Sequence, residues 1–319
     1  MGGRVSEDLT IRRFGPADEG LWNGFIQQAS NATFLHERGF MEYHADRFED
    51  FSLIIEDAGK PTALLPANRV KDVLFSHGGL TYGGLLVPPR LPAITVVEII
   101  RELREFLTNQ GVATLIYKPI PHIFHDQPSE ADLYALVNAG AKQNRADLGA
   151  AIPLHRRLPF NSLRKRGVKK ALKAGIQVRE STDFGSFWSV LHDVLSARHN
   201  TTPTHSLNEI ELLKNRFPDK IFLFAAFQDE TVLAGMVMFD CGPTVHAQYI
   251  ATTQAGRDLG ALDLLVHHLL GEVFVDRDWF SFGISTTDEG RELNVGLSRQ
   301  KEMFGGHSVV FSQYRWDLT

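Results

Sequence analysis

Two halves of this chain contain the same order of predicted strands and helices. In each half, two strands joined by a tight turn are followed by a third strand, a helix, a buried strand and a further helix. In the first half we expect these elements at residues 51–56, 62–66, 73–76, 94–107, 113–117 and 130–138. In the second half we expect them at 221–226, 232–239, 245–250, 262–273, 279–282 and 292–304. The repetition predicts an α/β (α+β) protein of two tandem domains, each a mixed twisted sheet flanked by helices.

The length of the chain agrees with two such domains. Its 319 residues suffice for two domains of roughly 150 residues each. We expect an N-terminal domain over residues 1–153 and a C-terminal domain over 154–319. The first helix of each domain has apolar residues at helical spacing, which are Ile94, Val97, Ile100, Leu103 and Leu107 in one and Leu262, Leu265, Val266, Leu269 and Val273 in the other.

Charge and cysteine content restrict the partners and the compartment. The net charge is −5, so bulk electrostatics do not favour nucleic acid or an anionic membrane, and a phosphate-bearing ligand needs a local basic site. The single cysteine, Cys241, excludes an intramolecular disulfide and fits a reducing compartment. No apolar run approaches the roughly 18 residues that span a bilayer, and the N-terminal residues have no apolar signal core. These features predict a cytoplasmic protein with no membrane span.

Three segments match motifs of a known enzyme superfamily. The first is the basic stretch 161–176, and the second is residues 257–261, which precede a predicted helix. In the third, the spacing from Asn294 to Gly305 matches the signature N-x-x-A-x-x-x-Y-x-K-x-G-F, except that Lys301 stands at the position of its tyrosine. With these residues the chain resembles the GNAT acyltransferases, most strongly in its second half. Its repeated order of elements resembles the tandem-GNAT, Fem-like family.

Within this group the chain looks most like the coenzyme A-dependent sugar N-acyltransferases. The phrases that support this resemblance lie at residues 47–52, 205–210 and 283–286. Such enzymes move an acyl group from acyl-coenzyme A to the amino group of a nucleotide-linked amino deoxysugar. The resemblance therefore implies this N-acyltransferase activity, with acyl-coenzyme A as co-substrate and no metal. A Fem-type transfer from aminoacyl-tRNA to a cell-wall precursor is one alternative, and a non-catalytic tandem-GNAT binding protein is another.

The resemblance implies a coenzyme pyrophosphate site before the helix predicted at 262–273. Arg257 and Gly260 match the first two positions of the motif R/Q-x-x-G-x-G/A, whereas Leu262 departs from its last position. Free backbone N–H groups at a helix N-terminus, here near Ala261, bind phosphate well. A plain strand-to-helix turn is the alternative interpretation of these residues.

The resemblance also implies a binding site for the pantetheine arm. The strand at residues 245–252 is expected to splay from the strand that follows it, which leaves backbone groups free for a ligand. Ile250, Ala251 and Ser285 are the matching positions, and Asn294 begins the motif that follows them. A simple buried strand pair is the alternative.

Lys301 stands where the GNAT signature has a tyrosine. A tyrosine can protonate a leaving thiolate, whereas a lysine suggests stabilisation of charge. Leu297 and Phe304 flank Lys301 at helical spacing, so its amine must extend to solvent or meet an anion. The resemblance implies that Lys301 stabilises an oxyanion or thiolate, or grips a phosphate. The alternative is a lysine with no functional role, which lies at the boundary of the apolar face and packs its aliphatic carbons there.

The proton acceptor is predicted in the segment between two helices of the second domain. His199 and His205 lie there, and a histidine with an ordinary pKa near 6.5 can take a proton from a sugar ammonium. A solvated loop histidine is the alternative for each. Asp288 is a second candidate base, although its place beside Gly290 also suits helix initiation.

Residues of both domains are expected to hold the acceptor. Tyr82 lies in a glycine-rich stretch, and Lys118 and His122 follow the end of a predicted strand, where ligand residues are common. Arg164 and Glu209 are the candidates of the second domain, although Ser206 and Glu209 also form a capping-box pattern.

The basic stretch 161–176 allows three interpretations. It is a solvated amphipathic helix, a phosphate site for the nucleotide sugar or coenzyme, or an RNA-binding helix. No aromatic residues interleave its cations, so no nucleic-acid partner is expected. A homodimer is compatible with the sequence, which does not identify the sugar or the acyl chain.

Overall fold

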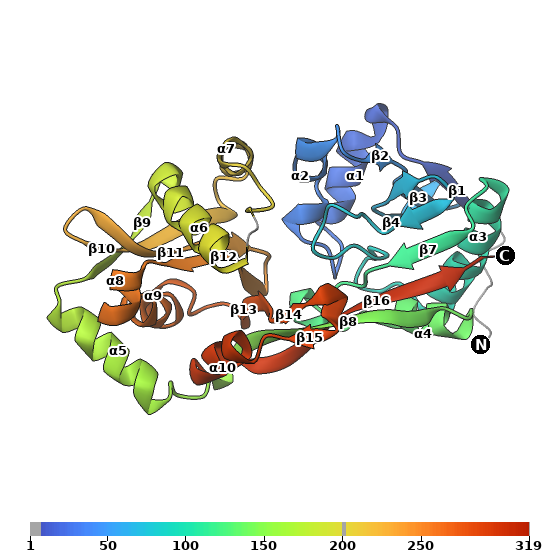
Figure 1. Ribbon diagram of the computed structural model, residues 1–319. Helices are drawn as coiled ribbons and strands as arrows, with labels where there is room; N and C mark the ends of the chain where they lie inside the picture. Colours follow the sequence, from blue (N-terminus) through green and yellow to red (C-terminus); the bar gives the residue numbers. More distant parts are fainter. Residues whose placement is uncertain (1–7, 200–201, 319) are drawn as a thin grey trace. The chain divides into compact units, whose positions relative to one another are not determined.

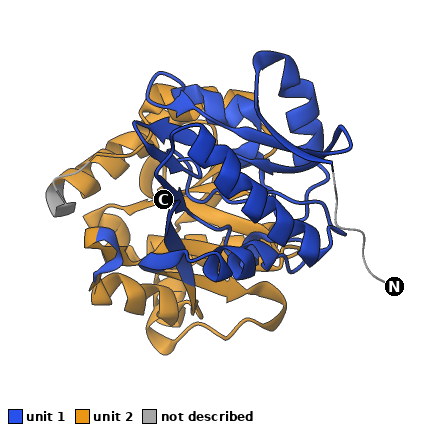
Figure 2. Ribbon diagram, turned by 90° about the vertical axis from the view of Figure 1, so that its right-hand side faces the viewer, with its two compact units in different colours: residues 1–147, 289–291, 310–319 blue, residues 148–288, 292–309 orange. Residues whose placement is uncertain are grey.

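The computed structural model describes residues 8–199 and 202–318, and the chain forms two compact units (Figure 1 and Figure 2). Unit 1 comprises residues 1–147, 289–291 and 310–319, and unit 2 comprises residues 148–288 and 292–309. The sequence analysis placed the boundary between residues 153 and 154 and assigned residues 310–319 to the second domain, whereas here they complete unit 1. No helix in the described ranges is both long and apolar enough to cross a membrane.

Unit 1 contains two sheets. A three-stranded antiparallel sheet has the order β1-β3-β4, and the other has the order β2-β5-β6-β7-β16, with the first residues of β8 next to β16. The strands are β1 (Leu9–Arg13), β2 (Glu49–Asp50), β3 (Leu53–Asp57), β4 (Lys60–Leu65), β5 (Asn68–Val70), β6 (Val73–Phe75), β7 (Thr114–Tyr117), β8 (Lys142–Pro153) and β16 (His307–Asp317). The α-helices are α1 (Glu19–Ile26), α2 (Arg38–Met41), α3 (Ala93–Asn109) and α4 (Ala131–Asn138).

The core of unit 1 joins α3 to strands that are distant in sequence. The helix predicted at 94–107 is confirmed, but its buried face is rotated from the expected one. Ile94 is 54% exposed because it lies in the first turn, and the buried apolar residues of α3 are Val96, Ile99, Ile100, Leu103 and Leu107. Trp316 of β16 is fully buried in the same core and pairs with Leu115 of β7. Residues near the end of the chain are therefore part of the unit with which the chain begins.

Unit 2 contains one mixed sheet in the order β8-β13-β12-β11-β10-β9, to which β8 contributes its second half. The strands are β9 (Gln177–Ser181), β10 (Ile221–Gln228), β11 (Thr231–Asp240), β12 (Thr244–Thr252) and β13 (Trp279–Ile284), with a small hairpin of β14 (Thr286–Thr287) and β15 (Glu292–Leu293). The α-helices are α5 (Ser162–Lys173), α6 (Phe184–His199), α7 (Leu207–Arg216), α8 (Gln254–Leu259), α9 (Ala261–His268) and α10 (Val295–Met303). The last helix begins later than predicted, because residues 292–293 pair with β14.

Helices cover both faces of the unit 2 sheet. Met236 of β11 is buried in one hydrophobic cluster with residues of α5 and α9. The preceding residue, Gly235, faces the other side, because successive residues of a strand alternate. There Phe187 of α6 packs directly on the strand, and a Cβ atom at Gly235 would lie 2.3 Å from the phenylalanine ring. The candidate site described below is lined by residues of α5 and α9 from one face and of α6 from the other.

Buried histidines in unit 1 make its stability sensitive to acid. Burial lowers the pKa of His36 to about 4 and that of His77 to about 2, from an ordinary 6.5. Below pH 6.5 the unfolded chain takes up protons that the folded chain does not, so the folded state becomes less stable as the pH is lowered.

We expect each histidine to lower the free energy of unfolding by about 1–2 kcal/mol between pH 7.5 and pH 5, measured by urea unfolding. His77→Asn should weaken this pH dependence, since asparagine tolerates the positive φ of 55° there. The same substitution at exposed His192 is the control, and an equal effect from it would contradict the assignment.

Candidate functional site in unit 2

The parallel pairing of β12 with β13 ends after three residue pairs. The last pair is His246 with Ser281, although β12 continues to Thr252 and β13 to Ile284. At the same point the pairing of β13 with β8 is interrupted between Ser281 and Ile284, and Gly283 has a φ of 68°. The two strands therefore separate, as expected for this strand pair, and the facing main-chain groups of β12 leave the ladder.

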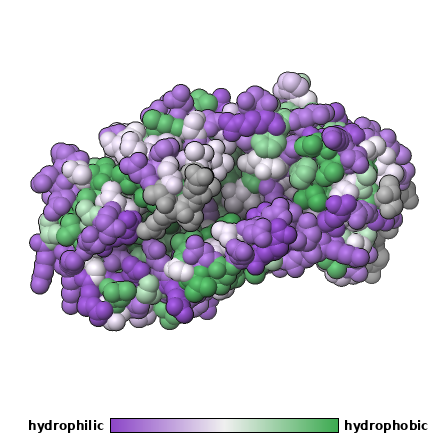
Figure 3. All heavy atoms as spheres, viewed as in Figure 1, coloured by the Kyte–Doolittle hydropathy of each residue, from purple (hydrophilic) through white to green (hydrophobic). Residues whose placement is uncertain are grey.

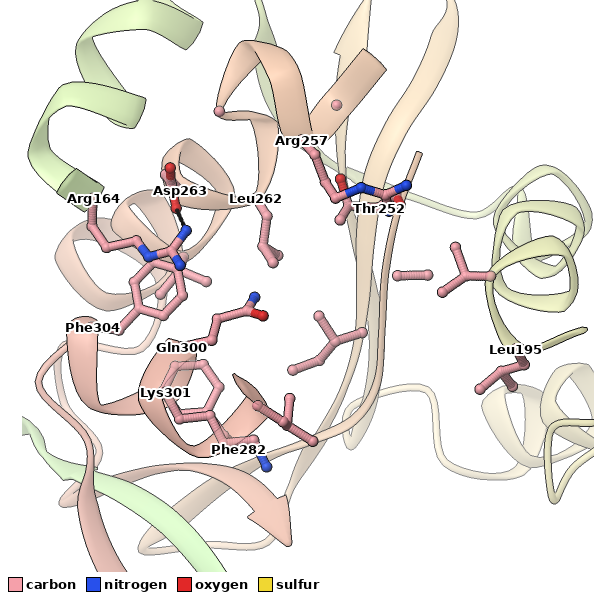
Figure 4. A pocket seen from close by; sticks show the side chains of 17 residues that line it. Arg164, Leu195, Thr252, Arg257, Leu262, Asp263, Phe282, Gln300, Lys301 and Phe304 are labelled. Carbon is pink, nitrogen blue, oxygen red and sulfur yellow. Dashed lines mark hydrogen bonds and ion pairs between the residues drawn. The ribbon is translucent and has the colours of Figure 1, made fainter. Parts of the chain in front are cut away.

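A pocket of about 450 Å³ lies beside this separation. Residues from β12, β13 and helices α5, α6, α8, α9 and α10 line it (Figure 4). Six residues that the sequence analysis selected are among them, namely Arg164, Ile250, Ala251, Arg257, Gly260 and Lys301. The structure thus brings together one predicted catalytic residue, four predicted coenzyme residues and one predicted acceptor residue.

Lys301 is buried at this pocket, with 4% of its surface exposed. Its Nζ atom donates hydrogen bonds to the main-chain oxygens of Gly283, at 2.9 Å, and Ile284, at 2.6 Å. The sequence analysis expected this amine to reach solvent or to meet an anion. The structure shows neither, because carbonyl groups at the irregular end of β13 accept its hydrogen bonds. Burial lowers the pKa of Lys301 to about 7, so its charge changes near neutral pH.

His246 is a second buried titratable group near Lys301. Burial lowers its pKa to about 4, and the positive charge of Lys301 acts in the same direction. Nδ1 of His246 lies 3.0 Å from the hydroxyl of Ser281, its partner in the last parallel pair. His246 is therefore neutral at physiological pH, and its contact with Ser281 lies at the point where the strands separate.

The N-terminus of α9 borders the pocket, and it lies in close contact with α5. Gly260 precedes the helix with a φ of 79°, and a Cβ atom there would lie 2.4 Å from the main-chain oxygen of Gly167. A Cβ atom at Gly167 would in turn lie 1.8 Å from Oδ2 of Asp263. Both glycines are needed for the two helices to approach. The first N–H groups of α9, beginning at Ala261, have no partner within the helix.

An ion pair crosses from α5 to α9 at the edge of the pocket (Figure 4). Nη1 of Arg164 donates to Oδ1 of Asp263 at 2.9 Å, and the guanidinium lies 4.9 Å from the ring centre of Phe304. Burial raises the pKa of Asp263, and Arg164 opposes this shift. The Nε atom of Arg164 is buried without a hydrogen-bond partner. The pair neutralises the carboxylate that α9 carries in its first turn.

Sequence reasoning did not select several lining residues, of which Thr252, Asp263 and Gln300 are polar. Gln300 points into the pocket in Figure 4. It lies on the helical stripe of Leu297 and Phe304, both of which the sequence analysis had placed near the apolar face. A polar residue on that stripe is the pattern that could have identified it. Asp263 could not be found in this way, because its role depends on the approach of Gly167.

Two of the three predicted proton acceptors, His205 and Asp288, do not line the pocket. His205 is buried, and its Nδ1 atom lies 2.5 Å from the hydroxyl of Tyr249. Tyr249 follows the strand alternation opposite to Ile250, so this pair lies on the α6 face of β12. Asp288 is exposed at a positive φ of 47°. The side chain of His199 lies outside the residues that the structure describes.

Other selected residues of unit 2 have local structural roles. Oδ1 of Asn294 accepts from the main-chain nitrogen of Leu297, which makes Asn294 the N-cap of α10. Glu209 forms the capping box of α7 with Ser206. The hydroxyl of Ser285 is buried without a hydrogen-bond partner, and this residue is not in the pocket lining.

The candidates of unit 1 lie in its interior or on its surface. Tyr82 is buried, and its hydroxyl donates to Oγ1 of Thr33 at 3.3 Å. Lys118 donates to the main-chain oxygen of Leu80, and burial lowers its pKa to about 8. His122 is exposed at the start of a 3₁₀ helix. Among the described residues of both units, no group of three or more histidine, cysteine or acidic side chains could hold a metal ion.

The fold is that of two tandem GNAT-type units. No protein-family model matches the chain, and no curated protein matches its sequence. The solved structure of FemX is similar over 97% of each chain, with a TM-score of 0.69 and 11% identity.

Two further solved structures share the fold. L-PGS from Bacillus licheniformis matches over 97% of this chain and 93% of its own, with a TM-score of 0.64 and 12% identity. A tandem GNAT protein from the clavulanic acid biosynthesis pathway matches over 98% and 99%, with a TM-score of 0.55 and 11% identity. At these identities the likeness shows the fold alone.

Gly260→Ala tests the contact that positions α9. The added methyl group would meet the main-chain oxygen of Gly167 at 2.4 Å, and alanine is strained at a φ of 79°. We expect the free energy of unfolding to fall by about 2–4 kcal/mol. Gly271→Ala is the matched control, because no atom lies within 4 Å of a Cβ there. Equal unfolding midpoints for the two variants in urea would contradict the proposed contact.

Proposed function

We propose that this protein is an N-acyltransferase that moves an acyl group from acyl-coenzyme A to the amino group of a nucleotide-linked amino sugar, such as a dTDP-amino-dideoxyhexose. The observation that carries the proposal is the pocket at the separation of β12 and β13, lined by the start of α9 and by Lys301. The proposal of an amino-sugar acceptor is based on the resemblance of short sequence segments. The proposal of an acyl-coenzyme A donor is based on the geometry of the pocket.

In this proposal the coenzyme lies between β12 and α9. The free edge of β12 after His246 can hydrogen-bond the amide groups of pantetheine as a neighbouring strand would. The N–H groups at the start of α9 can hold the pyrophosphate, helped by the helix dipole. Arg257 lines this part of the pocket, where Nη1 donates to the main-chain oxygen of Thr252 at 2.7 Å. Because Arg164 neutralises Asp263, that carboxylate repels the phosphates less.

The chemistry is a direct attack of the acceptor amine on the thioester carbonyl carbon. The carbonyl oxygen becomes an oxyanion, the C–S bond breaks and the thiolate leaves, while the nitrogen loses one proton. Lys301 has three N–H groups in its ammonium form, and two are bound by Gly283 and Ile284. The third is available to the oxyanion or the thiolate. The amine releases its proton to solvent, because neither His205 nor Asp288 lines the pocket.

The Fem-type transfer from aminoacyl-tRNA remains the alternative, because the FemX structure shares this fold. The two proposals differ in the donor that must bind the pocket. They are therefore separated by direct measurement of donor binding and consumption.

Coenzyme A should stabilise the protein if the proposal is right. A ligand present at about 100 times its Kd adds about 2.7 kcal/mol to the free energy of unfolding, which raises Tm by several degrees. The measurement is a thermal unfolding series with coenzyme A, followed by thiol release from acyl-coenzyme A with nucleotide-linked amino sugars. An unchanged Tm at millimolar coenzyme A, together with consumption of aminoacyl-tRNA, would favour the alternative.

Lys301→Met should lower kcat by at least roughly tenfold to a hundredfold while changing the affinity for coenzyme A much less, because it removes a donor to the developing charge. The ammonium form exists below the pKa of about 7. The advantage of the native protein over the variant should therefore be largest below pH 7 and shrink as the pH rises.

The control for this variant is Arg299→Met, since Arg299 lies on the same helix and is exposed. Rates are measured by thiol release across pH 5.5–9. Native kcat in the Lys301 variant, or the same ratio of rates at every pH, would exclude a charged role for Lys301.

A further inference from the structure

The positive charge of the chain is concentrated in one short segment of unit 2. Residues 155–173 contain eight of the 33 lysines and arginines and no acidic residue. The remainder of the chain has 25 basic and 38 acidic residues, so the net charge of −5 conceals a strongly basic region. Local charge, and not the total, decides whether an anionic surface is attracted.

Helix α5 exposes most of this charge. Its buried face consists of Val168 and Ala171, with Arg164 directed to the pocket described above. The five other cations of the helix are exposed, and none forms an ion pair within the described residues; they are Lys165, Arg166, Lys169, Lys170 and Lys173. These side chains are not used by the proposed acyl-transfer site.

A second pocket, of about 500 Å³, lies on one side of α5. Apolar residues including Phe160 and Val168 line it together with the cations Arg157, Lys165 and Lys169. The ring of Phe160 packs nearly perpendicular to those of His267 and Phe304, with ring centres 6.0 and 5.2 Å apart. An apolar pocket with basic residues suits a ligand that has both an anionic group and hydrocarbon.

Exposed leucines extend the apolar part of this face. Leu158, in the pocket lining, is 54% exposed, and Leu172 is 59% exposed. Leu172 follows Lys165, Val168 and Lys169 at helical spacing, so it lies on the side of α5 that bears the pocket. In Figure 3 hydrophobic and hydrophilic residues are mixed at the lower left, where Figure 1 shows α5. A cationic helix face with exposed leucines is typical of elements that lie on membrane surfaces.

We propose that residues 155–173 form a docking face for an anionic phospholipid membrane. The lysines and arginines contact lipid phosphates, while Leu158, Leu172 and the pocket beside α5 take up hydrocarbon at the level of the headgroups. RNA is the other large polyanion that a basic helix can bind. It is less well suited here, because Phe160 is the only Phe, Tyr or Trp in the segment, so its cations are not interleaved with aromatic rings on which successive bases could stack.

The test measures binding of the whole protein to vesicles in the absence of acyl-coenzyme A, so it is independent of the proposed function. Vesicles contain phosphatidylglycerol and phosphatidylcholine in equal parts, or phosphatidylcholine alone. We expect cosedimentation with the anionic vesicles at low salt, release at high salt, and no binding to the neutral vesicles. Lys165→Glu/Lys169→Glu should weaken binding by at least roughly thirtyfold, since each cation near the surface contributes about fivefold.

Two further variants separate specific docking from general charge. Lys60→Glu/Lys71→Glu changes the net charge equally at exposed positions of unit 1 and should leave binding unchanged. Leu158→Ser/Leu172→Ser keeps every charge and should weaken binding several-fold. The proposal is overturned if the native protein does not bind anionic vesicles at low salt, or if the control pair weakens binding as much as the α5 pair. It is also overturned if tRNA binds with the same sensitivity to Lys165→Glu/Lys169→Glu while vesicles do not bind.

Discussion

The candidate site depends on the early end of the pairing between β12 and β13. A ladder continued to Thr252 would satisfy the edge of β12 and leave no space for a ligand. Separation of the strands creates the space, but it releases main-chain groups that must find other partners. On the side of β13 the partner is Lys301, which binds the oxygens of Gly283 and Ile284. On the side of β12 the groups that follow His246 have no partner in the ladder with β13. One lysine thus supports the separation of the strands and also lines the pocket beside it.

Most of the fold could be predicted from the sequence, because the spacing of apolar residues within single strands and helices indicates where those elements lie. Alternating and helical apolar patterns located most strands and helices, and their repetition gave the two-unit architecture. The rotated face of α3 shows the limit of this reasoning, because Ile94 fits the helical pattern but lies in the first turn, beyond the core. The sequence could not predict that residues 310–317 belong to unit 1. Their place there depends on the pairing of Trp316 with Leu115, two residues that no local pattern connects.

The candidate site could be predicted only in part, and for a physical reason. Lys301, Gly260 and Ile250 were found because a motif spacing or a strand end marks them. The predicted base His205 is placed outside the pocket lining, because its partner Tyr249 faces α6 from β12. Asp263 and Arg164 form a pair only because Gly167 and Gly260 allow two helices to touch. Such pairs arise from three-dimensional approach and have no signature in a single sequence.

The sharing of the chain between the two units has a consequence for biosynthesis. Trp316 is fully buried in the core of unit 1, yet it is translated after every residue of unit 2. A ribosome that has made the first 147 residues has therefore not yet supplied the strand that pairs with β7. The usual order, in which the N-terminal domain folds first during synthesis, cannot be completed here. The sheet of unit 1 therefore lacks β16 until the end of the chain has been made, and unit 2 is the first unit whose residues are all available for folding.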